Sequence, residues 1–171
     1  MNATLVLLLT MAGAATAADQ PALRAPLYSA SERKPAPNFA LKDSAGKIAK
    51  LKSYHGKVVL LDFWATWCTG CKQEIPWFSE FQKLYGKKGL SVVGVSLDDG
   101  GWAVLKPFLD HANVPYRMVL GNDAVAQRYG IESMPDTFLI DRKGRIAAAY
   151  KAGLVDRSDI EANIKALLDR Q

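Results

Sequence analysis

The sequence predicts an α/β protein with a central mixed β-sheet flanked by helices. Two features support this fold class. Strand-like apolar runs alternate along the chain with amphipathic helical segments, and the last two predicted strands are joined by a short turn without a helix between them. The length of 171 residues suits one domain that is large enough to bury a core without disulfide staples.

The first segment has the pattern of an export signal. Residues 1–18 contain no charged side chain, and an apolar run over residues 5–9 is followed by small residues. Ala15 and Ala17 lie at the two positions that a signal peptidase inspects, so residues 1–17 are predicted to be a signal peptide. No Lys or Arg lies near the start, which departs from the usual signal pattern. An uncleaved anchor is the less favoured alternative, because the apolar stretch is short for a membrane helix. We therefore expect a periplasmic or otherwise exported protein, either free or tethered to the membrane through residues 1–18.

Two predicted regions follow the leader. Residues 18–36 are rich in Ala, Pro and charge, which is typical of an extended tether. The predicted domain covers residues 37–171. It begins with a hairpin, whose strands are the short alternating runs at residues 39–41 and 47–51 on either side of a Ser-Ala-Gly turn.

The remaining elements are predicted from their hydrophobic periodicity. Residues 58–64 form an almost continuous apolar run, which is typical of a central strand that is covered on both faces. Residues 158–170 form an amphipathic helix with Ser158 as the candidate N-cap. Between them we expect a helix at 68–85, a strand at 90–96, a helix at 102–111, a strand at 116–120, a helix at 122–129 and a strand hairpin at 137–141 and 145–150.

Composition argues against several classes of protein. The net charge is +5, but the basic residues are scattered and form no run of five, so a solvated surface explains them better than nucleic-acid binding does. Two cysteines are too few for a disulfide-rich mini-domain or for an all-cysteine zinc site. We expect no nucleic-acid partner and a monomeric protein.

Cys68 and Cys71 lie where the predicted central strand ends and the next helix begins. At a helix N-terminus, unpaired N–H groups and the helix dipole stabilise a thiolate, which lowers the pKa of the first cysteine below the free value of about 8.5. The second cysteine, one turn later, can resolve a mixed disulfide by intramolecular attack. A fixed staple is less favoured, because closing so small a loop constrains the unfolded chain little. A metal site would need further ligands, and His55 and His111 lie at spacings unlike any zinc pattern.

Asp62 and Glu74 are candidates for carrying a proton to and from Cys71. Asp62 is the only polar residue of its apolar strand, and burial would raise its pKa so that it exchanges a proton near neutral pH. Glu74 falls on the apolar arc of its helix, on the side of Cys71. Two alternatives are that Asp62 is a hydrogen-bonded structural carboxylate and that Glu74 emerges into solvent through a kink at Pro76.

The segment at residues 63–72 resembles the active-site signature of the thioredoxin superfamily. The wider pattern resembles the exported TlpA/ResA-like branch of that superfamily, which is related to the redoxins. The resemblance implies a thioredoxin-like fold with an added N-terminal β-hairpin. It runs from about residue 37 to the C-terminus and includes residues 38–43, Gly46, residues 56–57, Glu74, Pro76, residues 129–131 and 134–141, Gly144 and Gly153.

The same resemblance implies roles for individual residues. Cys68 would be the attacking thiolate and Cys71 the resolving thiol. Pro135 matches the cis-proline that lies against the disulfide, and the backbone of Met134 would pair with a substrate strand. Trp67 would cover the dithiol and shape the docking surface.

A thiol–disulfide oxidoreductase that needs no metal or cofactor is the function that these residues favour. Asp62 matches the buried acid typical of thioredoxins and Glu74 the acid typical of the ResA-like branch, so the chain combines both. The resemblance implies that the enzyme reduces disulfides of periplasmic proteins, for example apocytochrome c. A membrane-bound thiol donor would then reduce the enzyme again.

Two other functions are alternatives. A thiol peroxidase of the redoxin type needs a proline and a threonine just upstream of its cysteine, and here only Thr66 is present. A copper-binding or redox-sensing module would have a third soft ligand or a long spacing between its cysteines. Met134 could supply such a ligand if Pro135 lies against the thiols.

Overall fold

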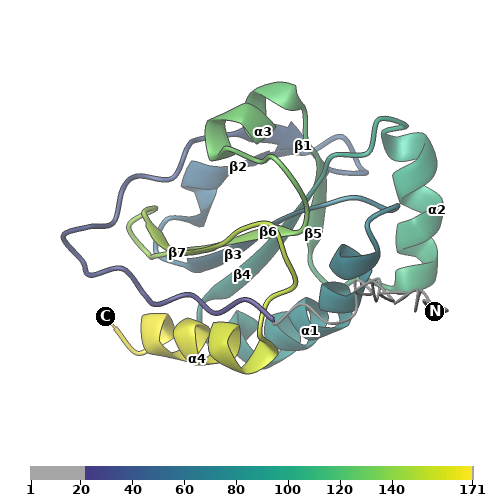
Figure 1. Cartoon of the computed structure of the whole chain (residues 1–171). Helices are drawn as coiled ribbons and strands as arrows, with labels where there is room; N and C mark the ends of the chain where they lie inside the picture. The colour runs from purple at the N-terminus through teal and green to yellow at the C-terminus, as the bar shows by residue number, and fades with distance from the viewer. Residues whose placement is uncertain (1–21, 171) are drawn as a thin grey trace, which may run out of the picture.

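The computed structural model describes residues 22–170. A five-stranded mixed β-sheet forms the centre of the protein (Figure 1). The order across the sheet is β5 (Arg117–Leu120), β4 (Leu90–Ser96), β3 (Val58–Trp64), β6 (Asp136–Ile140) and β7 (Ile146–Tyr150). β3, β4 and β5 are parallel, whereas β6 is antiparallel to β3 and β7 is antiparallel to β6. All seven residues of β3 are buried, which confirms the prediction of a central strand covered on both faces.

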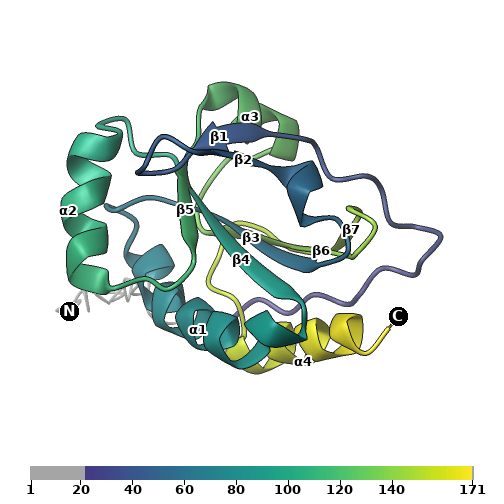
Figure 2. The same cartoon turned by 180° about the vertical axis from the view of Figure 1, so that it is seen from behind.

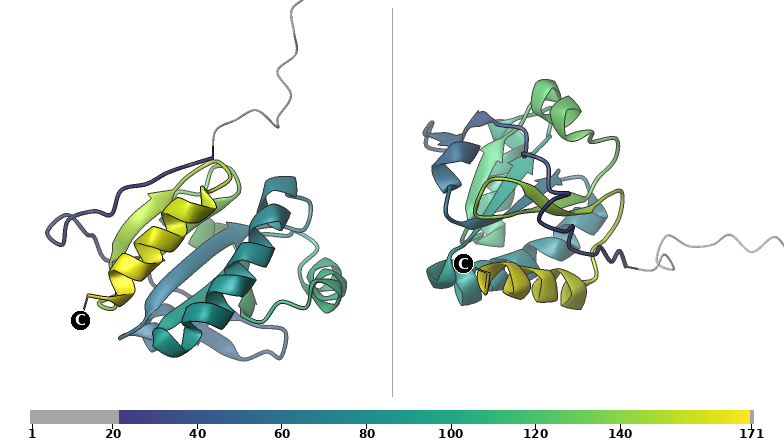
Figure 3. Two further views of the ribbon diagram at one scale, coloured as in Figure 1. Left: turned by 90° about the horizontal axis from the view of Figure 1, so that it is seen from below. Right: turned by 90° about the vertical axis from the view of Figure 1, so that its left-hand side faces the viewer.

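Helices and a separate hairpin cover the two faces of the sheet. The helices are α1 (Thr69–Tyr85), α2 (Trp102–Ala112), α3 (Asp123–Tyr129) and α4 (Arg157–Leu168), and the hairpin pairs β1 (Ala40–Lys42) with β2 (Ile48–Lys50). α1 and α4 lie side by side against one face (Figure 3). α3 and the hairpin cover the other face, while α2 lies beyond β5 at one edge (Figure 2). The predicted fold class and the predicted N-terminal hairpin are both confirmed.

Every predicted strand and helix is present, and the ends differ from the predicted ones by at most two residues. The predicted N-cap of the last helix is wrong. α4 begins at Arg157, and its N-cap is Asp156, whose carboxylate accepts the N–H groups of Ser158 at 2.9 Å and Asp159 at 3.1 Å. A carboxylate that accepts two N–H groups at the positive end of a helix is a stronger cap than a hydroxyl.

Replacing Asp156 by alanine should lower the midpoint of thermal unfolding by about 3 °C, because two N–H groups of α4 lose their acceptor. Ser158→Ala is the control, because it removes only an exposed hydroxyl that donates to Asp156. Its midpoint should change clearly less. Equal losses in the two variants, measured by circular dichroism, would contradict this assignment of the cap.

Residues 22–36, here named the N-terminal strap, lie along the loop before α4 and along the outer edge of β7. The backbone of Leu23 bonds to the loop, with its N–H on Leu154 O at 2.8 Å and its C=O accepting Asp156 N–H at 2.7 Å. Further backbone bonds join the strap to β7 and the turn before it: Tyr28 N to Ala147 O at 2.8 Å, Ile146 N to Lys34 O at 2.8 Å and Ala36 N to Gly144 O at 2.9 Å. The strap therefore covers an edge strand that would otherwise be free to pair with other chains.

The predicted signal peptide and the first part of the predicted tether lie outside the described residues. Within residues 22–170, none of the helices has the length and apolar character that a membrane span requires.

Candidate active site

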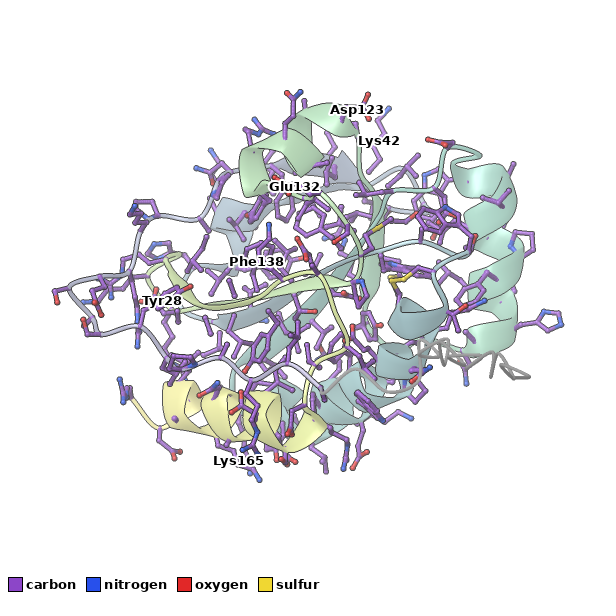
Figure 4. The ribbon with its side chains drawn as sticks, viewed as in Figure 1. Tyr28, Lys42, Asp123, Glu132, Phe138 and Lys165 are labelled. Carbon is purple, nitrogen blue, oxygen red and sulfur yellow. A yellow bond between two sulfur atoms is a disulfide. The ribbon has the colours of Figure 1, made fainter. Side chains whose placement is uncertain are left out.

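Cys68 and Cys71 lie at the N-terminal end of α1 and are joined by a disulfide, the yellow bond beside that helix in Figure 4. Cys68 is the N-cap of α1, and its Sγ accepts the N–H of Cys71 at 3.2 Å. Cys68 exposes 7% of its surface and Cys71 none. The first sulfur is therefore the one that a second molecule can reach, and it lies where the helix N-terminus stabilises a thiolate.

The residues predicted to contact substrate lie next to the cysteines in the sequence or pack against the turn between them. Trp67, directly before Cys68, exposes 66% of its surface. The peptide bond between Met134 and Pro135 is cis. A Cβ added to Gly70 would lie 3.5 Å from Cδ of Pro135, so the proline ring packs against the turn between the two cysteines. The structure thus places Pro135 against the turn between the cysteines, with Met134 directly before it in the chain.

Asp62 is fully buried in the middle of β3. Its Oδ1 accepts a long hydrogen bond of 3.4 Å from the hydroxyl of Thr137, which lies opposite it on β6. Burial raises the pKa of Asp62, and the negative charge of Asp136 raises it further. Asp62 therefore keeps its proton to a pH well above the usual range of an aspartic acid.

Glu74 is also fully buried, so the alternative in which it emerges into solvent is wrong. It lies one turn after Cys71 on the inner face of α1, and its Oε1 accepts the N–H of Val155 at 2.8 Å. Burial raises the pKa of Glu74, and the charge of Asp62 adds to this effect. The two carboxyls are therefore close enough for a charge on Asp62 to raise the pKa of Glu74.

Asp98 holds the loop before Cys68, and sequence reasoning missed it. Both of its carboxylate oxygens lie 3.1 Å from the N–H of Thr66, and Oδ1 also accepts the Thr66 hydroxyl at 2.6 Å. The Ser96 hydroxyl donates to Oδ2 at 2.8 Å. Thr66 and Asp98 each lie two residues after one of two neighbouring parallel strands, so their meeting at one edge of the sheet could have been inferred.

Asp136 was missed as well. It directly follows Pro135, is 1% exposed and forms an ion pair with Lys151 at 3.0 Å. Its Oδ1 accepts the N–H of Ala152 at 2.5 Å. The next residue, Gly153, donates its N–H to the carbonyl of Pro135 at 3.3 Å. Asp136 therefore fixes the loop between β7 and α4 against the proline of the site.

The arrangement is suited to dithiol–disulfide exchange. One sulfur is accessible and lies at a helix N-terminus, and the other is buried with two protonatable carboxyls nearby. Within the part of the chain that the structure describes, no three His, Cys, Asp or Glu side chains lie together in a way that could hold a metal ion.

The family model named AhpC/TSA family matches residues 33–149. The chain belongs to this family. It is also similar to thiol-disulfide oxidoreductase ResA of Geobacillus thermodenitrificans, with 32% identity over 133 residues that cover 77% of this chain and 75% of that protein. ResA of Bacillus subtilis is 37% identical over 119 residues, which cover 69% of this chain and 66% of the relative.

Solved structures of thiol–disulfide exchange proteins are also similar to this chain. A thiol:disulfide interchange protein DsbE from Chlorobium tepidum is 32% identical, with a TM-score of 0.73 over 86% of this chain and 99% of that one. A secreted thiol-disulfide isomerase from Corynebacterium glutamicum has a TM-score of 0.77 over 86% of this chain and 93% of that one, but its 20% identity speaks for the fold alone. This ResA-like chain is therefore a thiol–disulfide oxidoreductase with a thioredoxin-like fold, as its sequence predicted.

Proposed function

We propose that this oxidoreductase acts outside the cytoplasm as a reductant of protein disulfides, with Cys68 as the attacking thiolate and Cys71 as the resolving thiol. The observation that carries the proposed roles is the difference in exposure between the two cysteines, 7% for Cys68 against 0% for Cys71. An intermolecular attack needs the accessible sulfur, whereas an intramolecular attack can use the buried one.

The reaction has two exchange steps. The Cys68 thiolate attacks a substrate disulfide, so that a bond between Cys68 Sγ and one substrate sulfur forms while the other substrate sulfur leaves as a thiol after taking a proton. The Cys71 thiol then gives its proton to the buried carboxyl pair and attacks Cys68 Sγ. The second substrate sulfur leaves and is protonated. The substrate has gained two electrons and two protons, and the enzyme holds the Cys68–Cys71 disulfide.

The carboxyl pair is the proton acceptor in this proposal. Asp62 and Glu74 are fully buried, as Cys71 is, and Glu74 lies on the same helix face as the thiol. A buried thiol cannot release a proton to bulk water directly, so it needs an internal acceptor. The pair accepts a proton only in its ionised form, and its pKa values are raised to about 8 and about 9, so the resolving step should become faster as the pH rises toward 9.

For the substrate, we propose an extended segment of a periplasmic protein, for example apocytochrome c, that pairs with the backbone of Met134 and packs on Trp67. The exposed indole provides a large apolar surface for such a segment. A membrane-bound thiol donor would reduce the enzyme after each turnover. Export would follow from residues 1–17 as a signal peptide or anchor, and the mass of the N-terminal peptide of protein prepared from its host would show whether they are removed.

The reduction potential of the Cys68–Cys71 couple tests the proposed direction. Equilibration with dithiothreitol or glutathione, followed through the fluorescence of Trp67, should give a value closer to that of thioredoxin, about −270 mV, than to that of DsbA, about −120 mV. A value near −120 mV would make the protein an oxidant that introduces disulfides, and the proposed substrates would be wrong.

A further inference from the structure

Lys151 directly follows β7 and contacts both ends of residues 131–135, here named the proline loop. At the first end its ammonium group donates to the carbonyl of Gly130 and lies 3.4 Å from the carbonyl of Tyr129. At the second end the same ammonium forms the ion pair with Asp136, at 3.0 Å. One side chain from a different element of the fold therefore bridges the two ends of the loop.

At the first end, Lys151 caps α3. This helix ends at Tyr129, and Gly130 takes the left-handed conformation, with a φ of 63°, so that its N–H bonds back to the last turn. The last carbonyl groups of a helix have no partner within the helix, and the negative end of the helix dipole attracts a cation. Lys151 supplies both a donor and a positive charge at this point, which fixes where the proline loop leaves α3.

At the second end, the partner of Lys151 is a buried carboxylate. The side chain of Asp136 is 1% exposed, whereas that of Lys151 is 41% exposed. Among residues 22–170, Lys151 is the only residue that forms an ion pair with Asp136. A buried carboxylate depends strongly on its partners. The next residue after the lysine, Ala152, has a φ of 60°, a conformation that a residue other than glycine keeps only where its surroundings hold it.

Between its two ends the proline loop has little support of its own. Glu132 and Ser133 are exposed, and Met134 is half-buried. No hydrogen bond from any part of residues 22–170 holds the backbone of these three residues. The position of the Met134 backbone therefore depends on the two ends of the loop, and its N–H and C=O groups are left for a partner outside the chain.

We propose that Lys151 is a positioning residue for the substrate, because it holds the proline loop in the conformation in which the Met134 backbone pairs with an extended segment. The inference rests on the substrate pairing given under the proposed function and deepens it. Main-chain hydrogen bonds supply much of the affinity when an extended peptide is bound as a strand. A loop that is already ordered loses less conformational entropy when the peptide binds.

The test compares two disulfides in the full chain that carries Lys151→Met, which removes the charge and the donor but keeps a long side chain. One is an extended oxidised Cys-x-x-Cys peptide, and the other is hydroxyethyl disulfide, a small neutral molecule without a peptide backbone. The second-order rate constant for the peptide should fall on the order of tenfold, because the loop no longer positions it. The rate constant for hydroxyethyl disulfide should not change. Stopped-flow tryptophan fluorescence of the reduced enzyme measures both.

Lys143→Met is the matched control, because Lys143 is exposed in the turn at the other end of the β6–β7 hairpin. It should leave both rate constants unchanged. Amide hydrogen exchange, followed by mass spectrometry, gives a readout that does not depend on activity. Exchange in residues 131–135 should become faster in Lys151→Met and stay the same in Lys143→Met, while exchange in α1 should change in neither variant.

Two results would overturn the role of Lys151: an unchanged rate constant for the peptide, or an equal loss for both disulfides, which would mean general damage to the dithiol. If Lys151→Met does not fold, Lys151→Gln, which keeps an N–H donor without the charge, is measured against the same two disulfides. A wild-type enzyme that reduces neither disulfide contradicts the proposed function itself. One that reduces hydroxyethyl disulfide but not the peptide contradicts the proposed substrate and, with it, this inference.

Discussion

Replacing Cys71 by serine should turn the enzyme into a trap that accumulates a mixed disulfide between Cys68 and its substrate. Serine cannot attack the mixed disulfide, so turnover should fall on the order of a thousandfold while the first exchange step remains. An oxidised peptide that carries Cys-x-x-Cys-His, the haem attachment motif, is the substrate for the assay. The adduct is measured by mass spectrometry under non-reducing conditions.

The two cysteines serve as controls for each other in this experiment. Cys68→Ser should be as inactive as Cys71→Ser but should form no adduct, because the remaining sulfur is fully buried. Ser44→Ala, in the exposed turn between β1 and β2, should behave as the wild type. An adduct on Cys71 in the Cys68→Ser variant would show that the proposed roles are reversed.

The free energy of unfolding of the oxidised protein should fall as the pH rises from about 5 to 8. In the unfolded chain Asp62 and Glu74 release their protons near pH 4, whereas in the fold their pKa values are raised to about 8 and about 9. Between these limits the folded state binds more protons than the unfolded state, so stability decreases with pH. Each retained proton contributes about 1.4 kcal/mol per pH unit, so the loss over this range is about 4 kcal/mol for one retained proton.

Urea unfolding at several pH values measures this slope. Asp62→Asn and Glu74→Gln should each make it shallower, and the double variant should remove most of it. The lowered pKa of Asp141, where hydrogen bonds from Arg145 outweigh burial, has the opposite effect and acts only below about pH 4. Stability that is constant or that rises between pH 5 and 8 would show that the pair is ionised in the fold.

Much of this site could be predicted because the information is local. The helical periodicity of α1 alone placed Glu74 beside Cys71, and the apolar run of β3 placed Asp62 in the interior. The position of Asp98 depends instead on Thr66, which follows a different strand, and periodicity along one segment does not reveal such a partner. The N-cap of α4 was not predictable in the same way. Asp156 and Ser158 are both suitable cap residues, and the sequence does not show at which of them the helix begins.

The docked strap limits how far an anchored molecule could work from the membrane. Because Leu23 is already bonded to the loop before α4, only the five residues 18–22 would separate a retained anchor at residues 1–17 from the first bonded residue. Five residues span at most about 18 Å. A molecule that keeps its leader would therefore hold its folded domain close to the bilayer surface. A cleaved molecule would instead meet its partners by three-dimensional diffusion.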